Sequence, residues 1–462
     1  MEPRSLGYVT AACEGELRDG SPEMMVASLS TDSRQAGPGT LFVALAGERF
    51  DAHDFVEQAA GQGASAIVMD RNKARKLPCA VIAVDDTRKA LGRLAARYRA
   101  DFEVTVVAVG GSNGKTSTKE ILATLLRQKF PVVWSEASFN NDVGVPLTLM
   151  KLAREHRAAV LEVGTNHHGE LQPLLAMSQP QMTVLTNIGR EHLEFFKDLA
   201  GVAQEEGWLA EMTPADGKFF VNGDSEWTPK IARRCRGKVF RAGLGEHNEW
   251  RAADLRMDAR GNNFLVAAPI PAFSGRYQLS LIGRHQVANS LLAMAVAAEL
   301  GVSPEQIRSG LAECKPAKMR LQVWETRGVQ VLDDAYNANA DSMAAALETL
   351  SEFPCSGKRV AVLGDMAELG EESAKAHEEI GRKAAELRVD VLVTAGRWAE
   401  ETAGAARDAG LENVRVFPDL TSAAKALKEM VQAGDVLLLK ASRASGFERL
   451  GDALKSSEEI HE

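Results

Sequence analysis

Cysteine is scarce and scattered in this sequence. A chain of 462 residues contains only Cys13, Cys79, Cys235, Cys314 and Cys355, and their spacing matches neither a metal site nor a disulfide framework. Disulfide-stabilised secreted domains are therefore not expected. The pattern favours a reduced, cytoplasmic protein.

Long apolar runs and long basic runs are also missing. No uninterrupted apolar stretch approaches the ~20 residues that cross a bilayer, and the opening MEPRSLGYVTAACEG lacks the apolar core of a signal peptide. We expect no export and no membrane span. A net charge of −9 argues against nucleic-acid binding, which needs clustered lysine and arginine. Small anionic ligands remain compatible with this charge, because a local site can oppose the overall sign.

The sequence does contain three successive α/β patterns, and its length predicts several domains. Residues 1–100 combine TLFVAL, SAIVMD and AVIAVD with the amphipathic RKALGRLAARYRA, which predicts a small α/β domain. Residues 101–316 alternate VTVVAV, AAVLEVG and MTVLTNI with helical patterns, which predicts βαβ units and a parallel sheet. After ECKPAKMR, residues 317–462 alternate again through VQVLDDAY, RVAVLGDM, VDVLVTAG and DVLLLKAS. We predict an α/β protein with a central P-loop ATPase-type domain, a small N-terminal domain and a C-terminal Rossmann-like domain.

The stretch VVAVGGSNGKTSTKE, residues 106–120, resembles a phosphate-binding loop with altered spacing. The usual early glycine is replaced by Val109. The loop nevertheless follows a β-rich run and opens an amphipathic helix. There, glycines bring N–H groups to an anion, Lys115 neutralises phosphate charge, and Thr116 can bind Mg²⁺. A glycine-rich turn with an incidental lysine would not require the whole Gly-Lys-Thr tail, so we predict a nucleotide site here.

Polar side chains follow several predicted strands at the edge where ligands bind. Glu162 ends AAVLE beside the predicted loop, where a metal-binding role competes with that of a solvated strand-end glutamate. TNIGREHLE places Asn187 and His192 after the next strand. LDDAYNANADSM, LGDMAELGEES and KASRASGFERL supply polar groups from the third domain, including Lys440 and Arg443. Helix capping would explain some of these residues, but their density indicates a face that closes on the central domain.

These motifs together resemble the Mur ligase family, the amide-forming enzymes of peptidoglycan precursor synthesis. The family's loop has the pattern G-x-x-G-K-[ST], which Gly111, Gly114, Lys115 and Thr116 satisfy. TDSRQAGPGTLFVALAGERFDAHDF, NNDVGVPLTL, DDAYNANADSM, LGDMAELG and KASR are similar to the branch that adds D-Ala-D-Ala to UDP-MurNAc-tripeptide. The Asp-Asn-Pro-Arg and YAHTP-like segments of the diamino-acid branch are missing. The D-glutamate branch and folylpolyglutamate synthetase share the loop without the GERFDAHDF and YNAN pair.

The resemblance implies an ATP-dependent, ADP-forming ligase of cell-wall biogenesis, and hence of cell shape and division, acting as a cytoplasmic monomer. It also implies an acyl phosphate intermediate and two Mg²⁺ ions. Thr116 and Glu162 would hold the first ion, and His192 the second. The implied catalytic residues are Lys115, Glu162, His192, Glu206 and Arg320.

The resemblance further assigns binding residues to both substrates. Those for ATP are Gly111, Ser112, Asn113, Gly114, Lys115, Thr116, Ser117, Asn289 near adenine, Arg320 near the γ-phosphate and Asp334 near ribose. Those for the UDP-sugar peptide and the amine are Asp32, Ser33, Arg34, Gly47, Arg49, Asp51, His53, Asn141, Asn166, Tyr336, Asn337, Asn339, Lys440 and Arg443.

One position departs from the family pattern. Most members carry a lysine, carbamylated by carbon dioxide, on the helix after the histidine motif. Here the position 14 residues after His192 is Glu206, and Lys197 lies nine residues too early. We hypothesise that Glu206 supplies the second metal's carboxylate directly, so no lysine carbamylation is expected. The alternative is that Glu205 and Glu206 are solvated helix residues and the second metal is weakly held.

Other functions share part of this pattern. A P-loop kinase or motor ATPase explains the loop and Glu162 but leaves the asparagine-rich third domain unexplained. Another Mur-type amide ligase, a diamino-acid adder or a folylpolyglutamate synthetase-like enzyme, is a further alternative. A non-catalytic Mur-like protein that binds nucleotide as a scaffold is favoured only by the missing lysine. ADP formation that depends on both peptide and dipeptide distinguishes the ligase from a motor or a scaffold.

Overall fold

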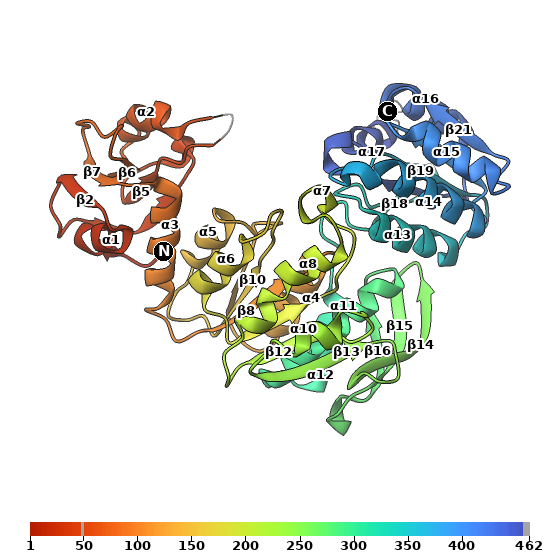
Figure 1. Ribbon diagram of the computed structural model, residues 1–462, viewed down its shortest axis with the longest axis horizontal. Coiled ribbons are helices and arrows are strands. Elements are labelled where there is room, and N and C mark those ends of the chain that lie inside the picture. Colours follow the sequence, from red (N-terminus) through yellow and green to blue (C-terminus); the bar gives the residue numbers. More distant parts are fainter. Residues whose placement is uncertain (48–49, 456–462) are drawn as a thin grey trace.

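The computed structural model describes residues 1–47 and 50–455, which form three α/β domains arranged in sequence order (Figure 1). Each domain has its own main sheet. In this described part, no helix combines the length and apolarity needed to cross a membrane. The predicted α/β class with three domains agrees with this architecture, and the boundaries at residues 100 and 316 stay a prediction.

The N-terminal domain contains a mixed sheet of order β2-β7-β6-β5-β4 and a small β1-β3 pair. Its helix α3 begins at an Asp86 cap, whose carboxylate accepts the N–H groups of Arg88 and Lys89. The elements are β1 (Arg4–Ser5), α1 (Leu6–Cys13), β2 (Glu16–Asp19), β3 (Met25–Val26), β4 (Ser28–Ser30), β5 (Thr40–Val43), α2 (Val56–Gly61), β6 (Ala66–Asp70), β7 (Ala80–Val84) and α3 (Thr87–Arg99).

The central domain is built on a sheet of order β16-β15-β14-β13-β12-β11-β8-β10-β9. Pairs from β9 to β14 are parallel, and β14-β15 and β15-β16 are antiparallel. Its strands are β8 (Thr105–Gly110), β9 (Val132–Trp134), β10 (Ala158–Glu162), β11 (Met182–Leu185), β12 (Lys218–Asn222), β13 (Lys238–Gly243), β14 (Trp250–Asp258), β15 (Gly261–Ala267) and β16 (Gly275–Leu279). Its helices are α4 (Lys115–Arg127), α5 (Gly144–Leu149), α6 (Leu171–Ser178), α7 (Leu193–Phe196), α8 (Leu199–Glu206), α9 (Trp208–Glu211), α10 (Thr228–Ala232), α11 (Arg284–Glu299) and α12 (Pro304–Glu313).

The C-terminal domain has a sheet of order β17-β18-β22-β19-β20-β21, parallel except for the β17-β18 edge pair. Helix α13 starts with a capping box between Asn339 and Ser342. The elements are β17 (Gln322–Thr326), β18 (Val329–Asp333), α13 (Ala340–Glu352), β19 (Arg359–Leu363), α14 (Ser373–Glu386), β20 (Val391–Ala395), α15 (Ala399–Asp408), β21 (Val414–Phe417), α16 (Leu420–Met430), β22 (Val436–Lys440) and α17 (Glu448–Lys455).

Strand β8 shows why the central sheet is sandwiched between helices. Val106 and Ala108 join one hydrophobic cluster, whereas Val107 and Val109 join another, as the two-residue period of a strand requires. The first cluster also contains apolar residues of α1 and α3, so the N-terminal and central domains share a continuous core. Residues of α4 and α11 cover the other face.

The central sheet extends beyond the predicted parallel series. Strands β14 to β16 form an antiparallel edge, and their sequence mixes polar and apolar residues because one face is partly exposed. The parallel strands that carry the predicted loop and strand-end residues lie in the middle of the sheet. The site is therefore formed at the carboxyl ends of β8, β10 and β11.

Candidate active site

The phosphate loop connects β8 to α4 and is shaped by two glycines. Gly111 and Gly114 have φ angles of +113° and +83°, in the left-handed region that favours glycine. A Cβ on Gly111 would lie 2.3 Å from the Thr186 hydroxyl, and one on Gly114 would lie 2.6 Å from the Asn289 amide oxygen. The loop is thus packed against β11 and α11 at its bends.

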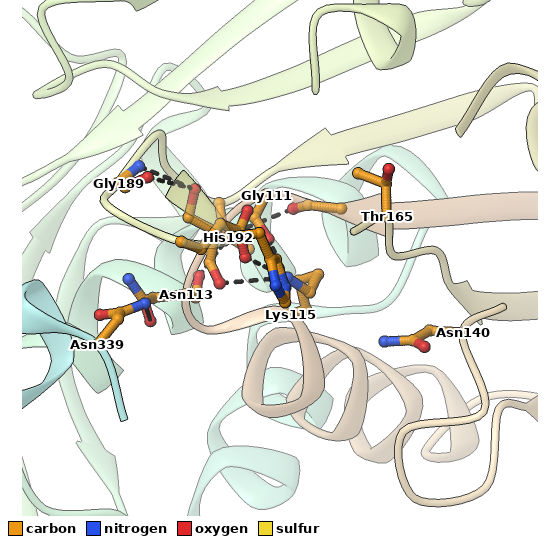
Figure 2. Close-up of polar contacts among 12 residues, drawn as sticks. Gly111, Asn113, Lys115, Asn140, Thr165, Gly189, His192 and Asn339 are labelled. Atoms are coloured by element: carbon orange, nitrogen blue, oxygen red, sulfur yellow. Dashed lines mark hydrogen bonds and ion pairs between the residues drawn. The ribbon is translucent and has the colours of Figure 1, made fainter. Parts of the chain in front are cut away.

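Lys115, the first residue of α4, lies back over its own loop (Figure 2). Its ammonium donates to the carbonyls of Gly111 (2.5 Å) and Ser112 (3.1 Å) and to Glu191 Oε2 (3.2 Å). Burial lowers the pKa of Lys115, but nearby carboxylates, led by Glu191 and Glu206, outweigh it and raise the pKa overall. The lysine is therefore a fixed cation at the bottom of the site.

Strand β10 delivers Glu162 to the start of α4. The Thr116 hydroxyl donates to Glu162 Oε2 at 2.8 Å, and the Asn140 amide donates to Oε1 at 3.0 Å. Both Thr116 and Glu162 are buried. An oxygen pair of this kind beside a phosphate loop suits Mg²⁺, which prefers oxygen ligands.

The segment after β11 brings two further carboxylates toward Lys115. Glu191 is 6% exposed and lines the cavity described below, and its Oε1 has no hydrogen-bond partner in the described chain. Glu206, at the end of α8, is 1% exposed, and neither of its carboxylate oxygens has such a partner. Burial, followed by the charge of Glu191, raises the pKa of Glu206 to about 8. The alternative that Glu205 and Glu206 are solvated is wrong, because both are buried.

The C-terminal domain closes the open side of the loop. The Asn339 amide donates to Asn113 Oδ1 at 3.0 Å across the domain boundary (Figure 2). Lys440 contacts Asp334 at 2.5 Å and donates to the Asn337 carbonyl at 3.2 Å. Between the two domains lies a cavity of about 400 Å³.

Most of the predicted nucleotide-binding and closing residues line this cavity. They are Ser112, Asn113, Gly114, Lys115, Thr116, Ser117, Glu162, Asn166, His192, Asn289, Arg320, Asp334, Tyr336, Asn337, Asn339 and Lys440. The Arg320 guanidinium lies 4.2 Å from the centre of the Tyr336 ring. The cavity thus gathers side chains from separate loops of two domains.

A few predicted residues near this cavity do not line it. Gly111 lies beneath Lys115, and Glu206 lies close to the position of a Gly110 Cβ. The Asn141 amide oxygen instead accepts the backbone N–H groups of residues 143 and 144, just before and at the start of α5. The Arg443 guanidinium lies 5.9 Å from the Tyr336 ring centre.

The predicted sugar-nucleotide residues lie in the N-terminal domain, apart from this cavity. The carboxylate of Asp32 accepts a hydrogen bond from the Arg34 guanidinium at 2.8 Å. Asp32 and Ser33 are partly exposed, and Arg34 is exposed. Asp51 caps a 3-10 turn and contacts the buried His53 ring at 2.6 Å. The Gly47 backbone N–H donates to the Phe50 carbonyl at 2.9 Å, and Arg49 lies outside the described residues.

Sequence reasoning missed several cavity residues. Ser138, Asn140, Glu191, Gln286 and Glu368 all line the cavity. Asn140 and Glu191 are the sequence neighbours of Asn141 and His192, which were predicted as site residues. The motifs that indicated those two residues therefore also contain Asn140 and Glu191. Glu368 lies in LGDMAELG, where nothing local distinguishes it from a surface glutamate.

Family models match three successive parts of the chain. They are the "Mur ligase family, catalytic domain" at residues 26–99, the "Mur ligase middle domain" at 109–297 and the "Mur ligase, glutamate ligase domain" at 319–443. The chain belongs to the Mur ligase family. The family resemblance seen in the motifs is confirmed.

Similar proteins within this family carry a common name. The UDP-N-acetylmuramoyl-tripeptide–D-alanyl-D-alanine ligase of Escherichia coli is 36% identical, with 98% of each chain covered. The enzyme of that name in Bacillus subtilis is 33% identical, covering 97% of this chain and 98% of the relative. A crystal structure of MurF from Acinetobacter baumannii has a TM-score of 0.90 at 33% identity, covering 98% and 99%. MurF from Thermotoga maritima, solved with ADP, has a TM-score of 0.82 at 28% identity, covering 93% and 97%.

Proposed function

We propose that this protein joins D-alanyl-D-alanine to UDP-MurNAc-tripeptide with hydrolysis of ATP to ADP and phosphate. The product is the UDP-MurNAc-pentapeptide precursor of peptidoglycan. The observation that carries the proposal is a phosphate loop enclosed by polar residues of the C-terminal domain, in a chain similar over nearly its whole length to ligases of that name.

The proposed chemistry proceeds through an acyl phosphate, because a free carboxylate does not condense with an amine at neutral pH. The γ-phosphoryl of ATP moves to the C-terminal carboxylate of the tripeptide, and the amine of D-Ala-D-Ala then displaces phosphate from the carbonyl carbon. Both reactants of the first step are anionic, so positioning and charge neutralisation dominate. Lys115, Arg320 and Lys440 are cations that line the cavity.

The residues fit Mg²⁺ on two observations. Glu162 and Thr116 present buried oxygen atoms beside the loop, and Glu206 is a buried carboxylate without hydrogen-bond partners. Across the described ranges, no three histidine, cysteine or carboxylate side chains form a complete metal cage. This suits an ion that takes its remaining ligands from substrate phosphates and water. Bound there, Mg²⁺ would neutralise charge on the transferring phosphoryl group.

We assign the first ion to Thr116 and Glu162 and the second to His192 and Glu206. Glu206 would provide, as an encoded side chain, the carboxylate that carbamylation makes elsewhere in the family. Its arm is about three bonds shorter than a carbamylated lysine, so a bridging water or a small backbone shift completes the contact. No lysine carbamylation is required.

The remaining roles follow the family pattern. Asn289 lies against Gly114 on the side assigned to adenine, and Asp334 near Lys440 is assigned to ribose. The N-terminal residues around Asp32 and Asp51 are assigned to the UDP-sugar. Tyr336 and its asparagine neighbours would exclude water from the acyl phosphate on closure. The protein would act as a cytoplasmic monomer.

Phosphate release tests this function. UDP-MurNAc-tripeptides that differ at the third residue are supplied with ATP and Mg²⁺, with and without D-Ala-D-Ala. We expect phosphate release that requires both peptide and dipeptide, with one preferred third residue. Release without either substrate would indicate a motor ATPase, and no release with any tripeptide would indicate a nucleotide-binding scaffold. Either result would refute the proposal.

A further inference from the structure

Residues 189–194, which join β11 to α7, hold the C-terminal domain through an ion-pair network. Arg190 donates its backbone N–H (2.7 Å) and Nε (2.9 Å) to Asp341. The two terminal nitrogens of its guanidinium donate to Glu379 at 2.6 and 3.0 Å. The segment that carries the predicted metal-binding histidine is therefore also a domain contact.

Helix α7 extends this contact with apolar side chains. Leu193 and Phe196 belong to the same hydrophobic cluster as apolar residues of α13 and α14. The backbone N–H of Glu194 donates to the Glu368 carbonyl at 3.2 Å. Figure 1 shows α7 beside the C-terminal domain, at the side of the central domain that faces it. The backbone on each side of the interface is thus fixed next to His192.

His192 and Glu368 meet directly at this interface. The Nδ1 atom of His192 lies 2.5 Å from Glu368 Oε2. Both residues line the cavity. The His192 backbone is held at a φ of +48°. The Nδ1 side of the His192 ring therefore faces a carboxylate of the other domain.

We propose that Glu368 is the positioning residue for His192. In this role its carboxylate would accept a hydrogen bond from Nδ1–H, which would turn Nε2 toward Mg²⁺. A metal-binding histidine commonly donates its second nitrogen to a carboxylate in this way. Here the carboxylate belongs to the other domain, so the ligand is oriented only when the C-terminal domain is closed. This inference rests on the proposed metal-binding role of His192.

Coupling of this kind acts in both directions. If closure strengthens metal binding at His192, the metal must stabilise closure by the same factor. The ADP-forming step would then be supported only in the closed state, in which Glu368, the metal and the acyl phosphate site are assembled together. Opening would weaken the metal contact and release the products.

Mn²⁺ binding tests the positioning role without relying on activity. The full chain, saturated with a non-hydrolysable ATP analogue, is titrated with Mn²⁺ and followed by electron paramagnetic resonance. We expect the wild type to bind two Mn²⁺ ions, and we expect Glu368→Ala to bind the second ion with 10- to 100-fold lower affinity. Glu368→Gln, whose amide oxygen still accepts Nδ1–H, recovers part of the affinity. Glu371→Gln is the matched control, because this exposed glutamate of the same loop has no ion pair in the described residues.

A double-mutant cycle distinguishes action through His192 from a general effect. His192→Ala and His192→Ala/Glu368→Ala should bind the second Mn²⁺ equally weakly, because the glutamate has nothing left to orient. Small-angle scattering should show Mn²⁺-dependent compaction of the protein that is reduced in Glu368→Ala.

Wild-type Mn²⁺ affinity in Glu368→Ala, or additive losses of affinity in the double variant, would overturn this inference alone. A wild type that forms product but binds a single ion would overturn the assignment of His192 and this inference with it, while leaving the ligase function intact.

Discussion

At the residue scale, Gly111 tolerates the least change in the phosphate loop. Its φ of +113° is strained for any L side chain, and the added Cβ would meet backbone atoms of Thr186 and Asn187 at 2.9 Å as well as the Thr186 hydroxyl. Backbone atoms of β11 and its following loop cannot move aside as a flexible side chain would. The loop is therefore shaped by its neighbours as much as by its own sequence.

Gly111→Ala should weaken ATP binding by roughly 10- to 100-fold, because strain of about 1–3 kcal/mol is placed on the loop. Calorimetric titration with an ATP analogue measures this loss. Gly404→Ala is the control, since Gly404 lies in helix α15 with open space around it and should gain up to about 1 kcal/mol of stability. An ATP affinity in Gly111→Ala equal to that of the control would contradict the assigned loop.

Glu206 gives a second prediction at this scale. Glu206→Ala should raise the Mg²⁺ concentration for half-maximal activity about tenfold or more, and wild-type activity should not respond to bicarbonate. Glu206→Lys, which places an ordinary lysine at the family position, should become dependent on bicarbonate. Ligase rates measured across Mg²⁺ and bicarbonate titrations check the Mg²⁺ dependence of Glu206→Ala and the bicarbonate responses of the wild type and Glu206→Lys. Unchanged Mg²⁺ dependence in Glu206→Ala would refute the encoded carboxylate.

At the scale of elements, helix α14 holds the loop that carries Glu368. His377 accepts the Met366 backbone N–H at Nε2 (3.0 Å), and its Nδ1 contacts the Ser373 carbonyl at 2.6 Å. The bond accepted at Nε2 requires the neutral ring, whereas Nδ1–H can donate to Ser373 in either form. Burial is the largest influence and lowers the pKa of His377. The unfolded chain therefore binds the proton more readily than the folded one.

The stability of this region should consequently depend on pH. The contribution of His377 is fully present above about pH 6.5 and is lost as the pH falls toward the lowered folded pKa, by at most about 1.4 kcal/mol per pH unit. Thermal unfolding between pH 5 and 8 should show a shallower slope in His377→Gln than in the wild type. The exposed His247→Gln serves as the control. Identical slopes in His377→Gln and the wild type would rule out this linkage.

The elements differ in how well the sequence predicts them. Strands such as β8, β10, β20 and β22 are buried on both faces and form plain apolar runs, so they were predicted. Strands β14 to β16 mix polar and apolar residues and were not. Helix α7 has four residues, too few for a helical period, and its orientation comes from packing against the C-terminal domain.

At the scale of the whole molecule, Arg190 joins two domains through residues more than 150 positions away. Arg190→Ala removes several charge-assisted hydrogen bonds, each of about 1.5–3 kcal/mol, so the closed population should fall and kcat should drop about tenfold or more. Small-angle scattering with the ATP analogue, together with ligase rates, measures both effects. Arg382→Ala is the control, because this arginine pairs with Glu378 on the same helix. A compact, fully active Arg190→Ala would show that the network does not hold the domains.

Contacts of this range explain why the site was only partly predictable. The nucleotide loop and Glu162 follow from local patterns, since a turn and a strand end define them. The contacts of Arg190 with Glu379 and of His192 with Glu368 join segments that are distant in sequence. Charged residues in loops have no periodicity, so only the packing of the two domains brings them together.

The backward position of Lys115 has a consequence for nucleotide affinity. Its ammonium has two carbonyls and a carboxylate of the protein as partners. ATP can engage this lysine only in exchange for bonds that exist beforehand. The measured affinity is therefore a net difference between two bonded states of Lys115, and Glu191 contributes to it through its bond to the ammonium.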